Sequence, residues 1–232
     1  MSRDAVLRVG ETVLATLLWV VLCVGSSALA LTVPVYTSAL VQALGVPAAS
    51  GLSTPDVVHL SGAVRALVAD TEFDPLPVTW KGQPAFDAAA SSHLHDVRSV
   101  ISGARLATGG AALLLAAYVG ACVGSRRFAR LRAGMRAAAW VLVAAVVLAA
   151  LAAFSDFEAL FAFFHSLFFA SGTWTFPGDS LLIRLFPEPF WIASGASWAA
   201  LVLFSAALLA LVERRFVRAR EGMGASRTAE NV

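Results

Sequence analysis

The sequence predicts an all-α integral membrane protein with four transmembrane helices. Of its 232 residues, 59% are hydrophobic and 14% are charged, and the mean hydropathy is +0.77, whereas ordinary soluble domains contain about 25% charged residues. A membrane-spanning helix needs about 20 apolar residues, and four windows of this length contain no Asp, Glu, Lys or Arg: residues 12–33, 106–123, 137–154 and 191–212. The composition excludes a soluble enzyme, and we expect one integral membrane domain over residues 1–232.

Charged residues are distributed unequally among the segments that flank these windows. The two terminal segments and the linker 124–136 together carry 12 basic and 5 acidic residues, whereas the long connections 34–105 and 155–190 carry 5 basic and 10 acidic residues. Cytoplasmic loops of membrane proteins are enriched in Lys and Arg. We therefore expect a multi-pass membrane protein with both termini in the cytoplasm and both long connections on the extracytoplasmic side.

The first window also has features of a cleavable signal peptide. Arg3 and Arg8 precede it, and Ala28-Leu29-Ala30 has the small residues of a cleavage site. The apolar run is long for a signal peptide and continues through Val33, which favours a retained transmembrane helix. Cleavage remains the alternative, and it would leave three spans with the same extracytoplasmic loops.

The first long connection is predicted to contain two helices. Thr54-Pro55-Asp56 predicts a helix start, with a cap, a proline in the first turn and an acid near the positive end of the helix dipole, and this helix is expected to run to Val68. Proline and glycine residues in 74–84 are expected to interrupt regular structure. A second helix is expected from Phe86 to Arg105, leading into the second span.

This second helix carries the segment His93-Leu94-His95-Asp96, and His93 and Asp96 lie one helical turn apart on one face. Three interpretations are open. One of the two histidines, with Asp96 and His165, could bind zinc, which accepts neutral imidazole and carboxylate ligands. A histidine could instead act as a general acid or base oriented by Asp96. The segment could also be a solvated helix face without a chemical role.

The second long connection is predicted to contain a helix that lies in the outer leaflet. Ser155–Glu158 fits a capping box, an apolar run follows, and Gly172 is expected to end the helix. The run is too short to cross a bilayer, which indicates a re-entrant or interfacial helix. His165 lies among its phenylalanines. Because ionisable groups at membrane depth are costly and usually functional, we expect a buried, neutral imidazole that can accept a proton; the alternative is a structural histidine that donates to a backbone carbonyl.

Other chemical motifs are scarce in this sequence. Cys23 and Cys122 both lie inside predicted spans and are expected to be buried and unpaired. There is no GxSxG or HExxH motif, no glycine-rich phosphate loop and no nucleic-acid signature, so neither a cofactor nor a nucleic-acid partner is expected. A serine nucleophile remains open, because several serines lie near the histidines: Ser91, Ser92, Ser166 and Ser171.

The order and spacing of several segments resemble the lipoprotein intramolecular transacylase (Lit) family of small four-span bacterial membrane proteins. His93–Arg98 resembles the family pattern H-[ML]-x-D-V-[KR], and Phe164–Phe169 resembles F-H-x-x-F-F. The remaining segments that carry the resemblance are Tyr36, Gly51-Leu52-Ser53, Trp174, Asp179–Ile183, Pro187 and Phe190-Trp191.

The resemblance implies an acyltransferase that acts on diacylated bacterial lipoproteins. The acyl chain at the sn-2 oxygen of the diacylglyceryl-modified N-terminal cysteine would move to the α-amine of the same cysteine, giving a lyso-form lipoprotein. No cofactor or metal would be needed, and the partners would be the lipoprotein N-terminus and membrane lipid. Two alternatives are a non-enzymatic lipid-binding or scaffold protein and a metal-dependent membrane hydrolase.

The resemblance also implies which residues form the site. The motif register selects His93 rather than His95, so that His93 and His165 would be the catalytic pair. The resemblance implies supporting or substrate-binding roles for five further residues: Asp96, Arg98, Trp174, Asp179 and Tyr36.

Overall fold

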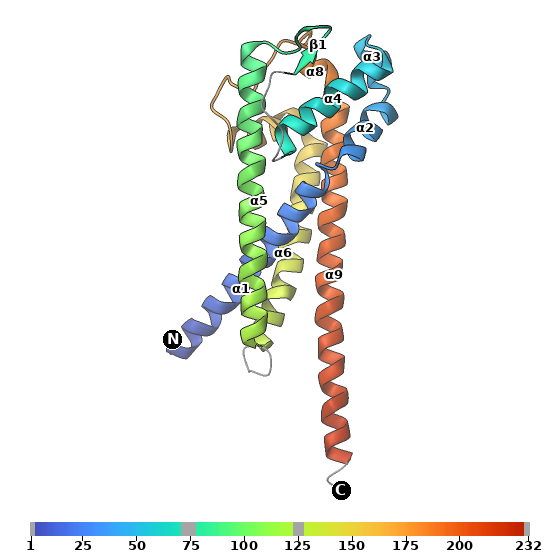
Figure 1. Ribbon diagram of the computed structural model, residues 1–232. Coiled ribbons are helices and arrows are strands. Elements are labelled where there is room, and N and C mark those ends of the chain that lie inside the picture. The colour runs from blue at the N-terminus through green and yellow to red at the C-terminus, as the bar shows by residue number, and fades with distance from the viewer. Residues whose placement is uncertain (1–2, 71–77, 123–127, 230–232) are drawn as a thin grey trace. The chain divides into compact units, whose positions relative to one another are not determined.

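The computed structural model describes residues 3–70, 78–122 and 128–229. These residues form helices and one short β-hairpin (Figure 1). In chain order the elements are α1 Arg3–Ala30, α2 Pro34–Ala43, α3 Val46–Ser50, α4 Thr54–Ala69, β1 Thr79–Trp80, β2 Gln83–Pro84, α5 Ala88–Cys122, α6 Phe128–Ser155, α7 Phe157–Ser166, α8 Leu181–Leu185 and α9 Glu188–Ala229.

Four of these helices, α1, α5, α6 and α9, are long and apolar enough to cross a membrane, which confirms the four predicted spans. Helix α1 ends at Ala30, before the predicted limit at Val33, because the chain turns there and α2 begins at Pro34. Helix α5 has 35 residues, since the helix predicted in the first long connection and the second span are continuous through Gly103.

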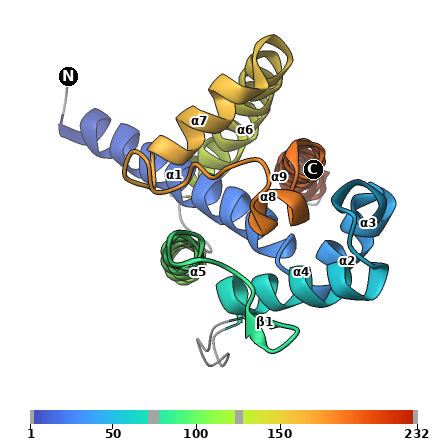
Figure 2. The ribbon, with the colours of Figure 1, turned by 90° about the horizontal axis from the view of Figure 1, so that it is seen from above.

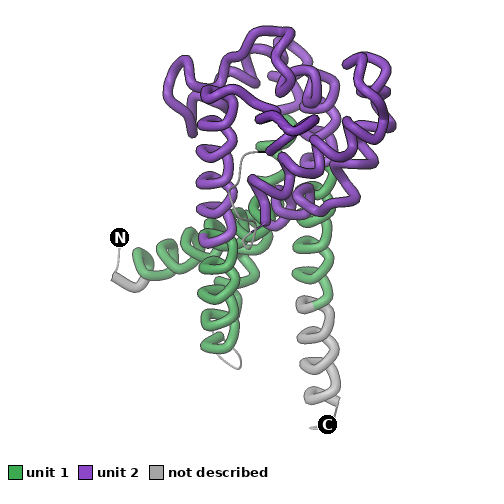
Figure 3. The backbone as a smooth tube through the Cα atoms, turned by 45° about the horizontal axis from the view of Figure 1, so that its top comes forward, with its two compact units in different colours: residues 1–25, 107–148, 200–232 green, residues 26–106, 149–199 purple. Residues whose placement is uncertain are grey.

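The chain divides into two compact units, coloured separately in Figure 3. One unit comprises residues 1–25, 107–148 and 200–232, and the other comprises residues 26–106 and 149–199. Each long helix contributes residues to both units. The second unit contains every candidate site residue.

In the first unit, small residues allow the membrane-spanning helices to pack closely. A Cβ atom placed on Gly134 of α6 would lie 2.7 Å from the Cβ atom of Ala15 on α1, and one placed on Gly25 would overlap Thr108 of α5. Small residues at such crossings let helix backbones approach within van der Waals contact. Ion pairs join Arg130 to Glu11 and Arg132 to Glu213 within the same unit.

The second unit has a hydrophobic core built from its short helices. Helix α4 packs against α2 and α3 (Figure 2), and α8 packs against α3 and α4. The buried residues of this core include Val41, Val57, Leu60, Leu94, Leu185 and Phe190. Leu94 neighbours His93 in the chain, so the core holds the helix turn that carries this histidine.

Two helices begin one residue away from their predicted caps. The N-cap of α4 is Ser53 rather than Thr54, because the Ser53 hydroxyl accepts the N–H of Asp56 at 3.3 Å. The N-cap of α7 is Asp156 rather than Ser155, which still belongs to α6; an Asp156 carboxylate oxygen accepts the N–H of Ala159 at 2.9 Å. Helix α7 ends at Ser166, before the predicted end at Gly172.

Part of the segment predicted to be irregular is a hairpin. Thr79 pairs with Pro84 and Trp80 pairs with Gln83, and Lys81 and Gly82 between them have φ angles of 52° and 78°. Positive φ at both central residues is the geometry that joins two antiparallel strands tightly. The Trp80 indole donates to Asp56 at 3.2 Å and so ties the hairpin to the start of α4. Asp74–Pro77, which were also expected to interrupt regular structure, lie outside the described residues.

Candidate active site

Two histidines from distant parts of the chain lie side by side in the second unit. His93 is on α5 and His165 is in the last turn of α7. Their ring centroids are 6.2 Å apart and their planes are inclined by 29°. Each residue is only 7% exposed. The fold thus brings together the two histidines that the sequence analysis selected as a pair.

The hydrogen bond made by His165 defines the protonation of its ring. Its Nδ1 atom lies 2.8 Å from the carbonyl oxygen of Phe161. A carbonyl oxygen only accepts hydrogen bonds, so Nδ1 carries the proton and Nε2 keeps a lone pair in the neutral imidazole. Burial lowers the pKa of His165 below its ordinary value of 6.5, although the bond to Phe161 acts in the opposite direction. His165 is therefore a neutral proton acceptor near pH 7.

His93 is held differently. Its Nδ1 atom is buried and has no hydrogen-bond partner among the described residues. The rings of Phe169 and Phe176 lie against it, with centroids at 4.8 and 5.5 Å. Asp96 is exposed, and the hydrogen bonds recorded for the described residues do not join it to His93. The neighbouring His95 is also exposed.

Aromatic rings enclose His165. The centroids of Phe161, Phe164 and Phe169 lie 4.0, 5.7 and 5.7 Å from it. The Trp174 ring lies 4.8 Å away and is inclined by 32°, and its Nε1 atom is buried without a hydrogen-bond partner in the described part of the chain. The histidine pair thus lies in an apolar environment with few polar atoms, where charge interactions are strong.

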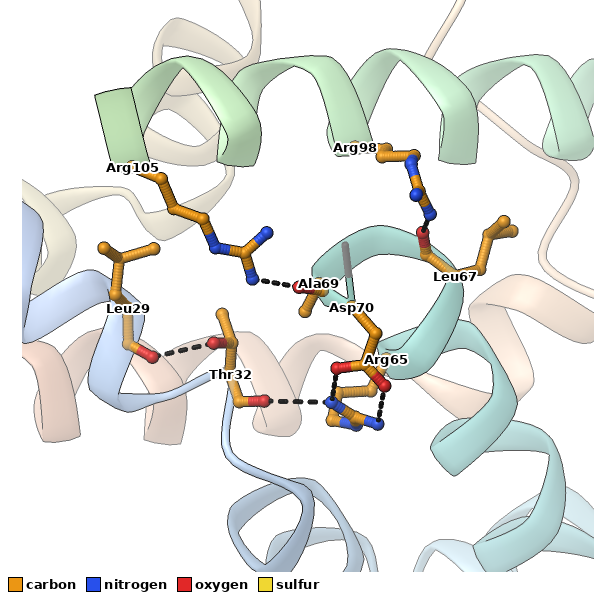
Figure 4. A network of polar contacts seen from close by, with 8 residues as sticks. All are labelled: Leu29, Thr32, Arg65, Leu67, Ala69, Asp70, Arg98 and Arg105. Carbon is orange, nitrogen blue, oxygen red and sulfur yellow. Dashed lines mark hydrogen bonds and ion pairs between the residues drawn. The ribbon is translucent and has the colours of Figure 1, made fainter. Parts of the chain in front are cut away.

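Arg98, which the sequence analysis placed among the supporting residues, binds the end of α4. Its guanidinium donates to the carbonyl oxygen of Leu67, and that of Arg105 donates to Ala69 (Figure 4). Arg65 forms two hydrogen bonds with Asp70, at 2.7 and 2.8 Å, and the bonds hold the pKa of that carboxyl below its usual range.

Arg98 and Arg105 match the carbonyl groups that the last turn of a helix leaves unpaired, and their positive charge complements the negative end of the helix dipole. The role of Arg65 and Arg105 was missed in the sequence analysis, because neither belongs to a local motif.

Tyr36 and Asp179 lie elsewhere in the same unit. The Tyr36 hydroxyl is 3.4 Å from the hydroxyl of Ser194, which joins α2 to α9. Asp179 is exposed immediately before α8, whose N-cap is Ser180. None of the contacts recorded for the described residues joins Tyr36 or Asp179 to either histidine. Phe176, to which the sequence analysis assigned no role, contacts His93.

A metal site needs several ligating side chains close together. Within residues 3–70, 78–122 and 128–229 there is no group of three or more His, Cys, Asp or Glu side chains placed to hold a metal ion. Cys23 and Cys122 are buried, as expected, and they form no disulfide bond.

Three solved structures with a similar fold are of one bacterial protein. The lipoprotein intramolecular transacylase Lit from Bacillus cereus matches with a TM-score of 0.77 and 11% identity, covering 94% of this chain and 99% of that one. Two variants of it, in which a histidine is replaced by arginine or by alanine, match with TM-scores of 0.61 and 0.62 and 14% identity. The match to the arginine variant covers 95% of this chain and 96% of the variant. The match to the alanine variant covers 94% of this chain and 97% of the variant.

A comparison with curated proteins found no match. The family model described as lipoprotein intramolecular transacylase Lit matches residues 12–191. This region includes all four spans in whole or in part and both histidines of the pair. The chain therefore belongs to the lipoprotein intramolecular transacylase (Lit) family.

Proposed function

We propose that this protein moves an acyl chain within diacylated bacterial lipoproteins, from the sn-2 oxygen of the diacylglyceryl group to the α-amine of the N-terminal cysteine. The amine nitrogen attacks the ester carbonyl carbon. A C–N bond forms, the C–O bond to the glyceryl group breaks, one proton leaves the nitrogen and one proton joins the glyceryl oxygen. The products are an amide and a free hydroxyl on the same molecule, so no second substrate is consumed.

The observation that carries this proposal is the buried pair of His93 and His165. Acyl transfer from an ester to an amine needs one group that removes a proton and one that supplies a proton. Two facing imidazoles meet both needs, and each can return to its starting state when the reaction ends. The hydrogen bond from His165 Nδ1 to Phe161 leaves Nε2 as the atom of this ring that accepts a proton.

Supporting roles follow from the positions of the neighbouring side chains. Asp96 is exposed one helical turn beyond His93, where its carboxylate would hold the amine of the substrate. Arg98 would act through α4, since it binds the carbonyl oxygen of Leu67. Tyr36 would hold α2 against α9 through Ser194, and Asp179 would contact the polar part of the substrate.

The location of the reaction is proposed from charge and hydropathy. Basic residues gather in the terminal segments and in 124–136, which favours an extracytoplasmic position for α7 and the first half of α5 in the bacterial cytoplasmic membrane. Helix α7 exposes Phe163 and Phe164, and the segment after it exposes Leu167 and Phe168. These large apolar side chains suit the outer leaflet, where they could contact acyl chains.

The test uses a reporter lipoprotein in a host that lacks other enzymes for N-acylation. Acyl migration leaves the intact mass unchanged, so the terminal peptide is analysed by fragmentation mass spectrometry and by the reactivity of its amine. We expect a blocked amine with the wild-type protein and a free amine with His93→Ala or His165→Ala.

His59→Ala and His95→Ala serve as matched controls, because both of these histidines are exposed; we expect the amine to stay blocked. Migration that continues in both variants of the pair would contradict the assigned roles. A free amine with well-expressed wild-type protein would contradict the proposed reaction.

A further inference from the structure

Resting on the proposed acyl transfer, we infer that the indole N–H of Trp174 is a catalytic hydrogen-bond donor to the carbonyl oxygen of the ester. The bond would be strongest when that oxygen carries negative charge, as the amine attacks. Trp174 thereby becomes a third functional group beside the two histidines.

The indole N–H of Trp174 lacks a hydrogen-bond acceptor in the described part of the chain, and its Nε1 atom is buried. An indole nitrogen is only a donor, so an acceptor must come from elsewhere. A buried donor without an acceptor is costly, and such groups in folded proteins call for an explanation. An ester carbonyl beside the histidine pair supplies the missing acceptor.

Other tryptophans of the same unit show the contrast. The Trp191 indole donates to the carbonyl oxygen of Phe186 at 2.8 Å, and the Trp80 indole donates to Asp56 at 3.2 Å. Trp19 also has an unpartnered Nε1 atom, but it belongs to the other unit, and the ring contacts recorded for the described residues do not join it to a histidine. An open indole donor next to the histidine pair is therefore a distinct feature of Trp174.

The ring of Trp174 also lies against that of His165. Their centroids are 4.8 Å apart and their planes are inclined by 32°. The N–H of an indole and the lone pair of an imidazole both lie in the ring plane. The donor of Trp174 and the free Nε2 of His165 thus belong to two neighbouring, tilted rings that border the same apolar site. This spacing suits a donor on the carbonyl oxygen and a base on the nitrogen that attacks the same carbonyl.

Phe161 holds both groups in place. Its carbonyl oxygen binds Nδ1 of His165, and its ring lies 4.0 Å from the His165 ring and 6.4 Å from that of Trp174. The phenyl rings around the pair offer no competing acceptor. During attack, an electron pair moves from the carbonyl bond onto its oxygen. A fixed donor in a site of low polarity stabilises that charge without further reorganisation.

The test is steady-state kinetics of purified full-length protein on a synthetic diacylated lipopeptide in lipid nanodiscs. Trp174→Phe keeps an apolar ring and removes the N–H. We expect its kcat to fall by about 100-fold, with little change in KM, because removal of one such donor in other enzymes costs about 100- to 1,000-fold. Trp191→Phe is the matched control, since it also removes an indole N–H; we expect nearly wild-type kcat.

A second variant separates the hydrogen bond from packing. Replacement of Trp174 by benzothienylalanine, in which sulfur takes the place of the N–H, keeps the two-ring shape, and we expect the same loss of kcat. A wild-type kcat in that variant would overturn the inference, as would a rise in KM alone, or equal losses in Trp174→Phe and Trp191→Phe.

Wild-type protein and His165→Ala are measured in the same assay. Migration by wild type with no effect of Trp174 substitutions overturns only the role of the indole. Absence of migration by well-folded wild type overturns both this inference and the proposed reaction.

Discussion

At the scale of the residue, the local chemistry of His165 decides its reactivity. Its ring is buried among aromatic side chains, and its one recorded hydrogen bond goes to a backbone carbonyl. A carbonyl oxygen fixes the tautomer but cannot stabilise the imidazolium as a carboxylate would. The sequence analysis treated two roles of His165 as alternatives: a structural donor to a backbone carbonyl and a neutral proton acceptor. The two roles are compatible, because Nδ1 makes the structural hydrogen bond and Nε2 keeps its lone pair.

The pH dependence of acyl transfer should report this environment. Burial lowers the pKa of His165 below 6.5, so the neutral form that accepts a proton persists as the pH falls through that value. The α-amine of the substrate must also be neutral in order to attack, and it becomes protonated below about pH 8. As the pH falls, we expect log kcat/KM to decline with a slope of about one below that pH, and with a slope of about two only below 6.5, where His165 also becomes protonated. Initial rates across a pH series, with buffers of constant ionic strength, measure this profile. A slope of about two that already begins above about pH 7 would contradict a lowered pKa of His165.

At the scale of the element, two kinds of contact hold the helices. In the first unit, α6 meets α1 at Gly134, where the Thr16 hydroxyl lies 3.4 Å from the Gly134 carbonyl oxygen. In the second unit, Arg98 and Arg105 of α5 bind the last carbonyl groups of α4. The first kind of contact depends on the absence of a side chain, and the second on long cationic ones. Both lie between elements far apart in sequence.

The crossing at Gly134 predicts an effect of a single methyl group. In Gly134→Ala the new Cβ would lie 2.7 Å from the Cβ atom of Ala15, so the helices must separate. We expect a loss of stability of about 1–3 kcal/mol, typical of overpacking, measured as a lower thermal midpoint in detergent.

Gly110→Ala is the matched control, because nothing lies within 4 Å of a Cβ at that position and alanine favours helix. Equal midpoints for the two variants would contradict close packing at Gly134.

At the scale of the whole molecule, the distribution of charge predicts the orientation in the membrane. The basic segments are expected on the cytoplasmic side, and the acidic connections on the other. Both native cysteines are buried and are readily replaced by alanine, which provides a background for site-specific labelling. The side of the membrane is thus accessible to a direct experiment.

The labelling experiment uses two single-cysteine variants at exposed positions, Ala129→Cys and Thr175→Cys. With a maleimide that cannot cross membranes, we expect Thr175→Cys to react in intact cells and Ala129→Cys to react only after permeabilisation. The reverse pattern would contradict the predicted orientation.

The number and position of the spans were predictable because hydropathy is a local property: about 20 consecutive apolar residues have few alternatives to a helix in lipid. Pairing between distant residues is not local. The helix starts at Ser53 and Asp156 were missed by one residue, because neighbouring residues can also cap a helix and the choice depends on where the preceding chain ends. The hairpin at Lys81-Gly82 was predicted as an irregular segment, because proline and glycine occur both in tight turns and in irregular loops.

The sequence by itself determined that this chain is a four-span helical membrane protein, and its motifs singled out His93 and His165. Only the tertiary structure decided how these residues are used. It brought the two rings to a centroid distance of 6.2 Å, gave Arg98 a helix end as its partner, and left the indole of Trp174 without an acceptor. The physical reason is that hydropathy and helix formation depend on neighbours in the chain, whereas these contacts depend on packing between elements that are distant in sequence.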